Sequence, residues 1–169
     1  MINNPALSNA LRFLLLLIVQ VLVFNRLNFF GFINPMVYIL FLYWYPIKEN
    51  RNLFVVLAFL LGFAIDFFSD TLALNATATL TIAYLRPTIM RFVFGVNYEF
   101  QSFKLSNSTR IQQFTFLTLL VIAHHTIFFG LEIFSFSNLL LILKKVVFTG
   151  IGTIVLCTLF ISLFGVSRE

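Results

Sequence analysis

Long apolar segments, separated by short polar connections, run through the whole of this 169-residue sequence. Hydrophobic residues make up 60% of the chain and charged residues only 10%, whereas soluble domains carry roughly 25% charged residues. A chain with so few polar groups does not cover a water-facing surface. Soluble enzymes, disordered tails, disulfide scaffolds and zinc ribbons are therefore excluded. The sequence predicts an all-α integral membrane protein with a single domain over residues 1–169.

Six segments are expected to cross the membrane, because a spanning helix uses about 20 residues. The second segment is short and needs Phe32 and Ile33 to lengthen it. The last apolar stretch is interrupted by Lys144 and Lys145, so a short interfacial segment over about 136–145 is expected before the final span. The predicted spans are residues 12–30, 32–46, 53–69, 74–94, 114–131 and 146–164.

The positions of Lys and Arg predict the orientation of the chain. With both termini in the cytoplasm, eight basic residues lie on the cytoplasmic side and three on the outer side. A five-span arrangement, which would move the two lysines, stays open. Orientation and anionic lipid headgroups explain these charges, and we expect no nucleic-acid partner. The cytoplasmic set is Arg12, Lys48, Arg51, Arg86, Arg91, Lys104, Arg110 and Arg168, and the outer set is Arg26, Lys144 and Lys145.

A carboxylate lies inside the third segment. Asp66 follows Ala58 and Gly62 at four-residue steps, so the three residues share one face of a helix. Small residues on such a face allow a second helix to approach closely. Asp70 is expected to end the helix at the outer surface. An aspartyl-protease dyad needs carboxylates from different segments, so a helix-packing or partner-binding role is favoured over catalysis.

Small and polar side chains also mark packing faces in later segments. Arg86 and Pro87 are expected to close or kink the fourth helix near the inner surface, with Arg86 and Arg91 extending to lipid headgroups. The expected faces are Asn75, Thr79 and Ala83 in the fourth segment and Thr149, Thr153 and Cys157 in the last.

The adjacent residues His124 and His125 raise the question of metal binding. Successive helical positions point about 100° apart, so this pair does not chelate one ion as a His-x-x-x-His pair does. His125 aligns with Thr118 and Glu132, but His125 and Glu132 lie roughly 10 Å apart along a helix. We therefore expect no metal and no other cofactor, and a buried polar stripe that contacts a neighbouring helix.

The stretch Leu60–Asp70, followed by residues 72–76, resembles the signature of the MreD family of rod-shape-determining membrane proteins. The matching motif positions are Gly62, Asp66 and Asn75. Further matches resemble the Bacteroidetes-type branch in particular, and they lie at residues 83–87, at the pair His124-His125 and at residues 131–134.

The resemblance implies a non-enzymatic subunit of the bacterial cell-elongation (rod) complex, which organises peptidoglycan synthesis and maintains cell shape. It implies a location in the bacterial cytoplasmic (inner) membrane beside MreC, a single-span protein with a large periplasmic domain. The other implied partners are an actin-like filament protein, a SEDS-type glycosyltransferase and a class B penicillin-binding transpeptidase. The implied fold is a six-helix bundle like the substrate-binding components of energy-coupling-factor transporters. Ala73 departs from the family, which commonly has glycine there.

Two other classes of function stay open. A small-molecule-binding subunit of a transporter needs a cavity with convergent polar groups, for which Asp66, Asn75, His125 and Glu132 are the candidates. An intramembrane hydrolase needs paired carboxylates or an activated nucleophile, and Cys157 has no visible base. Under the resemblance, the hypothesis is that a face near Asp66 receives the single helix of the partner, so that Asp66→Leu disrupts assembly.

Overall fold

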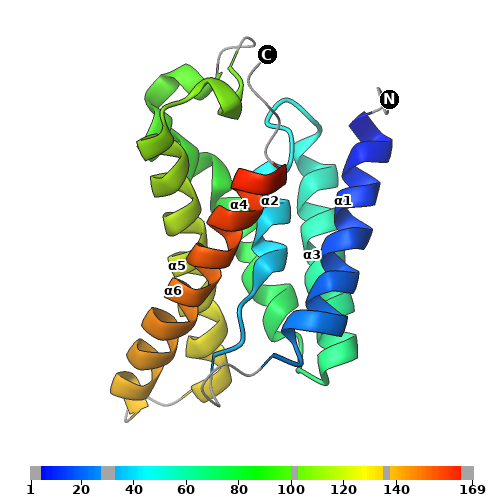
Figure 1. The fold of residues 1–169 in the computed structure, drawn as a ribbon, viewed down its shortest axis with the longest axis vertical. Coiled ribbons are helices and arrows are strands. Elements are labelled where there is room, and N and C mark those ends of the chain that lie inside the picture. Colours follow the sequence, from blue (N-terminus) through cyan, green and yellow to red (C-terminus); the bar gives the residue numbers. More distant parts are fainter. Residues whose placement is uncertain (1–4, 28–32, 100–102, 135–137, 165–169) are drawn as a thin grey trace.

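In this computed structural model, the regular elements of the described residues are helices (Figure 1). Those residues are 5–27, 33–99, 103–134 and 138–164. Parts of several predictions lie outside them: the end of the first span, the first residue of the second span, residues 136 and 137 of the interfacial segment, and Arg168.

Within the described residues, four helices are long and apolar enough to cross a membrane, as expected for a multi-pass membrane protein. The first is α1 (Pro5–Val19), which continues into the π-helical turn η1 (Gln20–Phe24). The others are α3 (Arg51–Ser69), α5 (Arg110–Ile133) and α6 (Leu139–Phe164). α1 starts at residue 5 rather than 12, because polar Asn and Arg side chains are tolerated within its apolar sequence.

Capping side chains explain where α3 and α5 begin. The side chain of Asn50 accepts hydrogen bonds from the backbone N–H groups of Asn52 and Leu53. Thr109 and Gln112 form a capping box, in which each side chain binds the other residue's backbone. α3 thus starts at residue 51 rather than 53, and α5 at residue 110 rather than 114.

The fourth helix, α4 (Leu74–Phe94), has the predicted bounds and packs between α3 and α5. Its threonine, asparagine and arginine residues make it less apolar than its neighbours, and it is not among the four candidate membrane-spanning helices. The helix continues through Pro87. Of the two predicted outcomes, closure at this residue is therefore wrong, and a kink stays a prediction.

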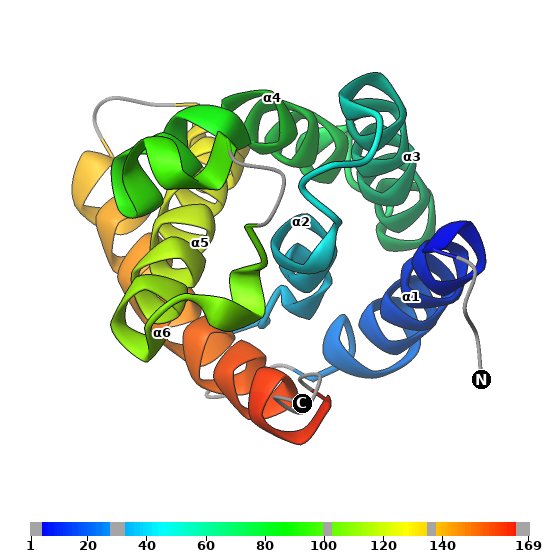
Figure 2. The same ribbon diagram turned by 90° about the horizontal axis from the view of Figure 1, so that it is seen from above.

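The second segment differs most from its prediction. Only residues 37–44 are helical, as the 3-10 turn η2 (Val37–Ile39) and the short helix α2 (Leu40–Trp44), while residues 34–36 have no regular structure. Eight helical residues extend about 12 Å, well short of the roughly 30 Å hydrocarbon layer. Figure 2 shows α2 inside a ring of α1, α3, α4, α5 and α6. Accordingly, no side chain from residue 37 to 43 is more than 3% exposed.

α6 runs without a break through Lys144 and Lys145. The separate interfacial segment predicted for residues 136–145 is therefore not found over residues 139–145. Apolar residues on both sides of the lysines continue the helix, and Lys145 binds Glu132 of α5 at 2.7 Å. The prediction of a buried face at Thr149, Thr153 and Cys157 is confirmed, since all three are at most 1% exposed.

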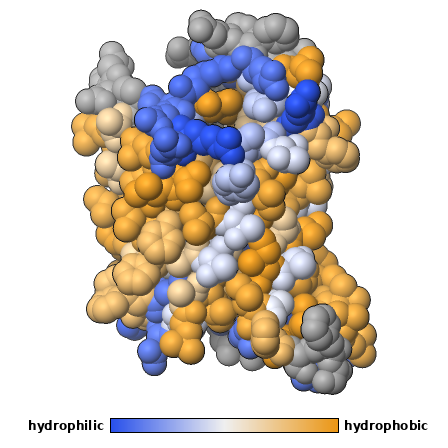
Figure 3. All heavy atoms as spheres, turned by 180° about the vertical axis from the view of Figure 1, so that it is seen from behind, coloured by the Kyte–Doolittle hydropathy of each residue, from blue (hydrophilic) through white to orange (hydrophobic). Residues whose placement is uncertain are grey.

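The outer surface is apolar between two more polar ends (Figure 3). One end, which we call the basic end, contains the turn after α2, the start of α3, the end of α4 and the short 3-10 turns η3 (Gly95–Glu99) and η4 (Leu105–Asn107). α1 begins and α6 finishes at the same end (Figure 1). Its exposed cations are Lys48, Arg51, Arg91, Lys104 and Arg110.

Candidate functional site

A buried carboxylate joins the end of α3 to the start of α4. Asp66 is 4% exposed, and its Oδ2 accepts a hydrogen bond from the backbone N–H of Ala76 at 2.7 Å. Its Oδ1 accepts bonds from the backbone N–H (3.0 Å) and Nδ2 (2.9 Å) of Asn75, and from the hydroxyl of Thr71. The N-cap residue of α4, Ala73, makes no side-chain cap bond. Asp66 therefore supplies the acceptors, and the negative charge, that this helix start favours.

The second aspartate of the predicted pair lies outside this group. Asp70 ends α3 in the left-handed conformation, with φ 54°, and its side chain is exposed. The prediction that it marks the helix end is confirmed. Ala73 is also left-handed, with φ 57°, a conformation that glycine adopts at lower cost.

The predicted packing faces of α3 and α4 contact each other. A methyl group added at Gly62 would lie 2.6 Å from the carbonyl oxygen of Asn75, 2.7 Å from Cα of Ala76, and also against the hydroxyl of Thr79. Ala58, one turn earlier on the same face, is fully buried, as is Thr79. The absence of a side chain at Gly62 thus allows the two backbones to approach closely.

Tyr38 connects this joint to α5 through the centre of the bundle. Its hydroxyl donates to Oδ1 of Asn75 at 2.6 Å and lies 3.0 Å from Nε2 of His124. Because the hydroxyl proton is directed at Asn75, Nε2 of His124 carries the proton and donates to the tyrosine oxygen. Asp66, Asn75, Tyr38 and His124 form one chain of hydrogen bonds, which we call the Asp66 chain. It ends at Nδ1 of His124, which has no partner among the described residues.

A second buried group centres on α6. His125 donates from Nδ1 to the carbonyl of Val121 at 2.8 Å, and its Nε2 lies 3.2 Å from the hydroxyl of Thr153. The same hydroxyl oxygen accepts the backbone N–H of Met36 at 3.1 Å. This threonine of α6 therefore serves a backbone group of the non-helical segment before α2.

Gln20, the first residue of η1, completes the binding of that segment. Its Oε1 accepts the backbone N–H groups of Val37 (2.8 Å) and Tyr38 (3.3 Å), and its Nε2 donates to the carbonyl of Pro35 at 3.1 Å. Backbone polar groups away from water need partners. Side chains of η1 and α6 provide these partners for the residues that precede α2.

Glu132 does not join these groups. It is on the surface, where it binds Lys145, so the predicted stripe from His125 to Glu132 is split. The four residues considered for a transporter cavity are therefore not gathered at one place. Within the described ranges, no three His, Cys, Asp or Glu side chains lie close enough to hold a metal ion.

The prediction that Arg86 extends to lipid headgroups is wrong. Arg86 is only 5% exposed, and its Nη2 donates to the carbonyls of Tyr45 (2.6 Å) and Tyr43 (3.4 Å). Its guanidinium carbon lies 4.9 Å from the ring centre of Phe54 and 6.0 Å from that of Phe116. The short helix α2 ends inside the bundle, so its last carbonyls need internal donors, and Arg86 reaches them from α4.

Arg12 of α1 serves the same helix end. Its Nη1 lies 3.5 Å from the carbonyl of Trp44, and cations are favourable near a helix C-terminus. By contrast, Arg91 is exposed on α4.

The sequence reasoning missed the roles of Gln20, Tyr38 and Arg86. A polar signal was present for Gln20, which interrupts a long apolar run, and polar residues in such a position usually face the bundle interior. Tyr38 carried no such signal, because an aromatic residue in an apolar segment is ordinary. Its partners lie 37 and 86 residues away.

Comparisons with family models, with curated proteins and with solved structures find no match to this chain.

Proposed function

We propose that this chain is a non-enzymatic membrane subunit of the bacterial cell-elongation (rod) complex that binds an MreC-like single-span protein. The observation that carries the proposal is the joint between α3 and α4. The residues on which the resemblance rests, Gly62, Asp66 and Asn75, contact one another there. The signature residues thus build one tertiary joint in this chain.

The contacts of the buried polar side chains support a structural, non-enzymatic role for this chain. Asp66, Asn75, Tyr38 and His125 bind groups of this same chain, and these bonds connect residues 36–38 with α4, α5 and α6. Their effect is to fix the bundle. A partner then binds the outer, apolar helix surfaces, where close side-chain packing drives association in lipid.

The proposed fold has six membrane crossings, with both termini in the cytoplasm of a cell with an inner membrane. α4 has 21 residues, or about 32 Å of helix, and it lies beside α3 and α5. The second segment combines non-helical residues with eight helical ones, about 25 Å in all by usual backbone rises. This architecture is the one implied for relatives of energy-coupling-factor substrate-binding components, and the likeness transfers no substrate.

The proposed contact surface is the outer face of α3 near its joint with α4. Phe63 and Phe67 are 51% and 76% exposed there, one turn apart on the helix. The earlier hypothesis used Asp66→Leu as its test. Because Asp66 is buried within the joint, this substitution removes internal bonds and does not report on the partner alone.

The test is co-purification of the tagged chain with the MreC-like protein of the same organism in mild detergent. We expect a stoichiometric complex that Phe63→Ala together with Phe67→Ala weakens at least tenfold. A matched control is Val155→Ala with Leu159→Ala on α6, whose side chains are 53% and 52% exposed and which should leave the complex intact. If the purified chain is monodisperse but captures no MreC-like protein, the proposal fails.

The remaining proposed partners, the rod-complex glycosyltransferase and the penicillin-binding transpeptidase, join through the same complex. Their recovery in the same pull-down, at lower yield than the MreC-like protein, is the expected result.

A further inference from the structure

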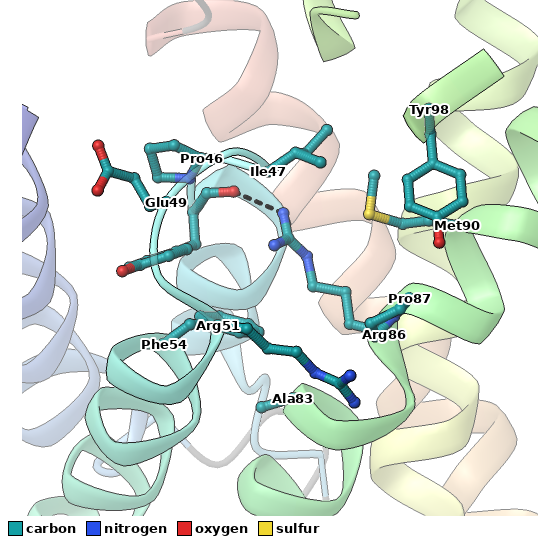
Figure 4. Close-up of a pocket in the computed structure, with 11 residues that line it drawn as sticks. Pro46, Ile47, Glu49, Arg51, Phe54, Ala83, Arg86, Pro87, Met90 and Tyr98 are labelled. Atoms are coloured by element: carbon teal, nitrogen blue, oxygen red, sulfur yellow. Dashed lines mark hydrogen bonds between the residues drawn. The ribbon is translucent and has the colours of Figure 1, made fainter. Parts of the chain in front are cut away.

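A cavity of about 80 Å³ lies at the basic end, between the turn after α2, the first turn of α3 and the second half of α4. Its walls are apolar at Ile47, Phe54 and Met90. Arg86 lines it as well, and so does Glu49, a carboxylate residue. Figure 4 shows the Arg86 side chain reaching from α4 towards the turn that contains Pro46 and Ile47, with a dashed line marking its bond to the Tyr45 carbonyl. A water molecule needs about 10–15 Å³ of such space, so the cavity has room for several waters or one phosphate group.

Arg86 forms no ion pair with another described residue. Glu49, which lines the same cavity, is exposed and does not lie within ion-pair distance of Arg86. The ion pair found within the described residues joins Lys145 to Glu132, at the other end of the bundle. The bonds that Arg86 donates go to two neutral carbonyls and both come from Nη2, while its buried Nε–H has no acceptor within the described ranges. A guanidinium presents five N–H donors in a planar fork. Arg86 thus retains its charge for an anion.

The surroundings favour an anion that belongs to an amphiphile. Arg51 also lines the cavity, and its guanidinium donates to the carbonyl of Tyr84 at 3.3 Å and lies over the Tyr84 ring. Lys48 lies nearby, with its ammonium bonded to the carbonyls of Tyr98 and Glu99. Figure 3 shows hydrophilic residues concentrated at this end and apolar surface directly below it. Basic clusters at a membrane surface attract anionic lipids. A phosphate in the cavity would leave attached acyl chains beside the apolar surface.

We propose that this cavity binds a phosphate group, held by the guanidinium of Arg86 with Arg51 at its rim. The phosphate comes either from an anionic lipid headgroup or from free phosphate, since both present the oxygens that arginine pairs with in bidentate geometry. The bound anion neutralises the charge beside α2 and fixes the turn over residues 45–49 against α4. The proposal does not depend on the proposed function, because it rests on the cavity and Arg86 alone.

The experiment measures binding of fluorescent phosphatidylglycerol to the full chain in a neutral detergent. Unlabelled phosphatidylglycerol, phosphatidylcholine and inorganic phosphate are the competitors. We expect displacement by phosphatidylglycerol and at least tenfold weaker displacement by phosphatidylcholine. Displacement by inorganic phosphate at millimolar concentration assigns the site to the free anion, and its failure assigns the site to the lipid headgroup. The absence of saturable binding of the fluorescent phosphatidylglycerol overturns the proposal.

Two variants locate the site. Arg86→Gln should weaken phosphatidylglycerol binding at least tenfold, whereas Arg91→Gln, which removes an exposed arginine of the same helix, should change it less than twofold. If Arg86→Gln does not elute as a monodisperse protein, Met90→Phe tests the same point, because it fills the cavity and keeps the arginine. Equal losses in the Arg91 variant, or unchanged binding when the cavity is filled, contradict the assignment.

Discussion

At the scale of single residues, the structure depends on polar side chains that act across helices. Asp66 caps a helix to which it does not belong, because the residue at the cap of α4 is an alanine. Removing an acceptor from a buried donor costs about 1–3 kcal/mol, and Asp66 serves four donor groups. The cost of losing its carboxylate therefore exceeds that of losing an exposed charge.

We expect Asp66→Asn to lower the free energy of unfolding by about 1–3 kcal/mol. The amide keeps one acceptor oxygen but turns an N–H₂ group towards donors, and the negative charge at the start of α4 is lost. Thermal unfolding of the purified protein in one detergent measures the effect. Asp70→Asn is the matched control, since Asp70 is exposed and asparagine tolerates its left-handed conformation. Equal shifts in the two variants would contradict the capping role.

Tyr38 gives a second test at this scale. Tyr38→Phe removes one hydroxyl and leaves both Oδ1 of Asn75 and Nε2 of His124 without that partner, so we expect a loss of about 1–3 kcal/mol. Tyr84→Phe removes a hydroxyl from a ring that is 65% exposed and should change the unfolding midpoint little. The unfolding midpoints of the two variants are measured side by side. A smaller loss of stability for Tyr38→Phe than for Tyr84→Phe would refute the stabilising role of the Tyr38 hydroxyl.

At the scale of elements, the sequence predicted an element well where its hydrogen-bond partners are close in sequence, and poorly where they lie in another helix. The bounds of α3 and α4 were predicted within two residues, because polar connections and the helix end at Asp70 lie close to the helices that they delimit. The structure of the second segment was not predicted, because the side chains that accept hydrogen bonds from its backbone, Gln20 and Thr153, lie in other helices. A local sequence pattern does not predict such partners. Arg86 was misplaced for the same reason, since its acceptors lie more than 40 residues away.

The close contact between α3 and α4 predicts the effect of a single methyl group. Gly62→Ala should lower stability by about 1–3 kcal/mol, the usual cost of overpacking, because the added carbon meets backbone atoms of α4. Gly130→Ala is the control, since nothing lies within 4 Å of an added Cβ there. Alanine favours a helix over glycine by about 1 kcal/mol, so this control should be neutral or stabilising. Thermal unfolding of both variants in one detergent gives the comparison, and a neutral Gly62→Ala would show that the helices separate readily.

At the scale of the whole molecule, the apolar composition alone was enough to predict an all-helical membrane protein. It was not enough to predict that one segment would be enclosed by the others. The faces of small residues were recognised, and those of α3 and α4 meet as packing surfaces. The pairing of polar side chains such as Gln20 and Thr153 depends on how the helices are arranged. The sequence pattern of a single segment does not contain that information.

The proposed six crossings predict opposite exposure of two connections. In Leu72→Cys the thiol replaces a side chain that is 94% exposed before α4, and in Ser106→Cys it lies in the connection after α4. A membrane-impermeant maleimide should label the first variant in intact spheroplasts and the second only after permeabilisation. The native Cys157 is buried and should not react, which the unsubstituted chain checks. Labelling of both variants from the same side would show that α4 does not cross.

The bond between Met36 and Thr153 constrains the order of assembly during synthesis. These residues are 117 positions apart, and at about 5–20 residues per second the ribosome takes on the order of ten seconds to cover that distance. Until α6 emerges, the backbone N–H of Met36 lacks its final acceptor, although the flanking segments have already left the ribosome. The centre of this protein is therefore completed last, and a chain truncated before residue 153 should remain with the insertion machinery or be degraded.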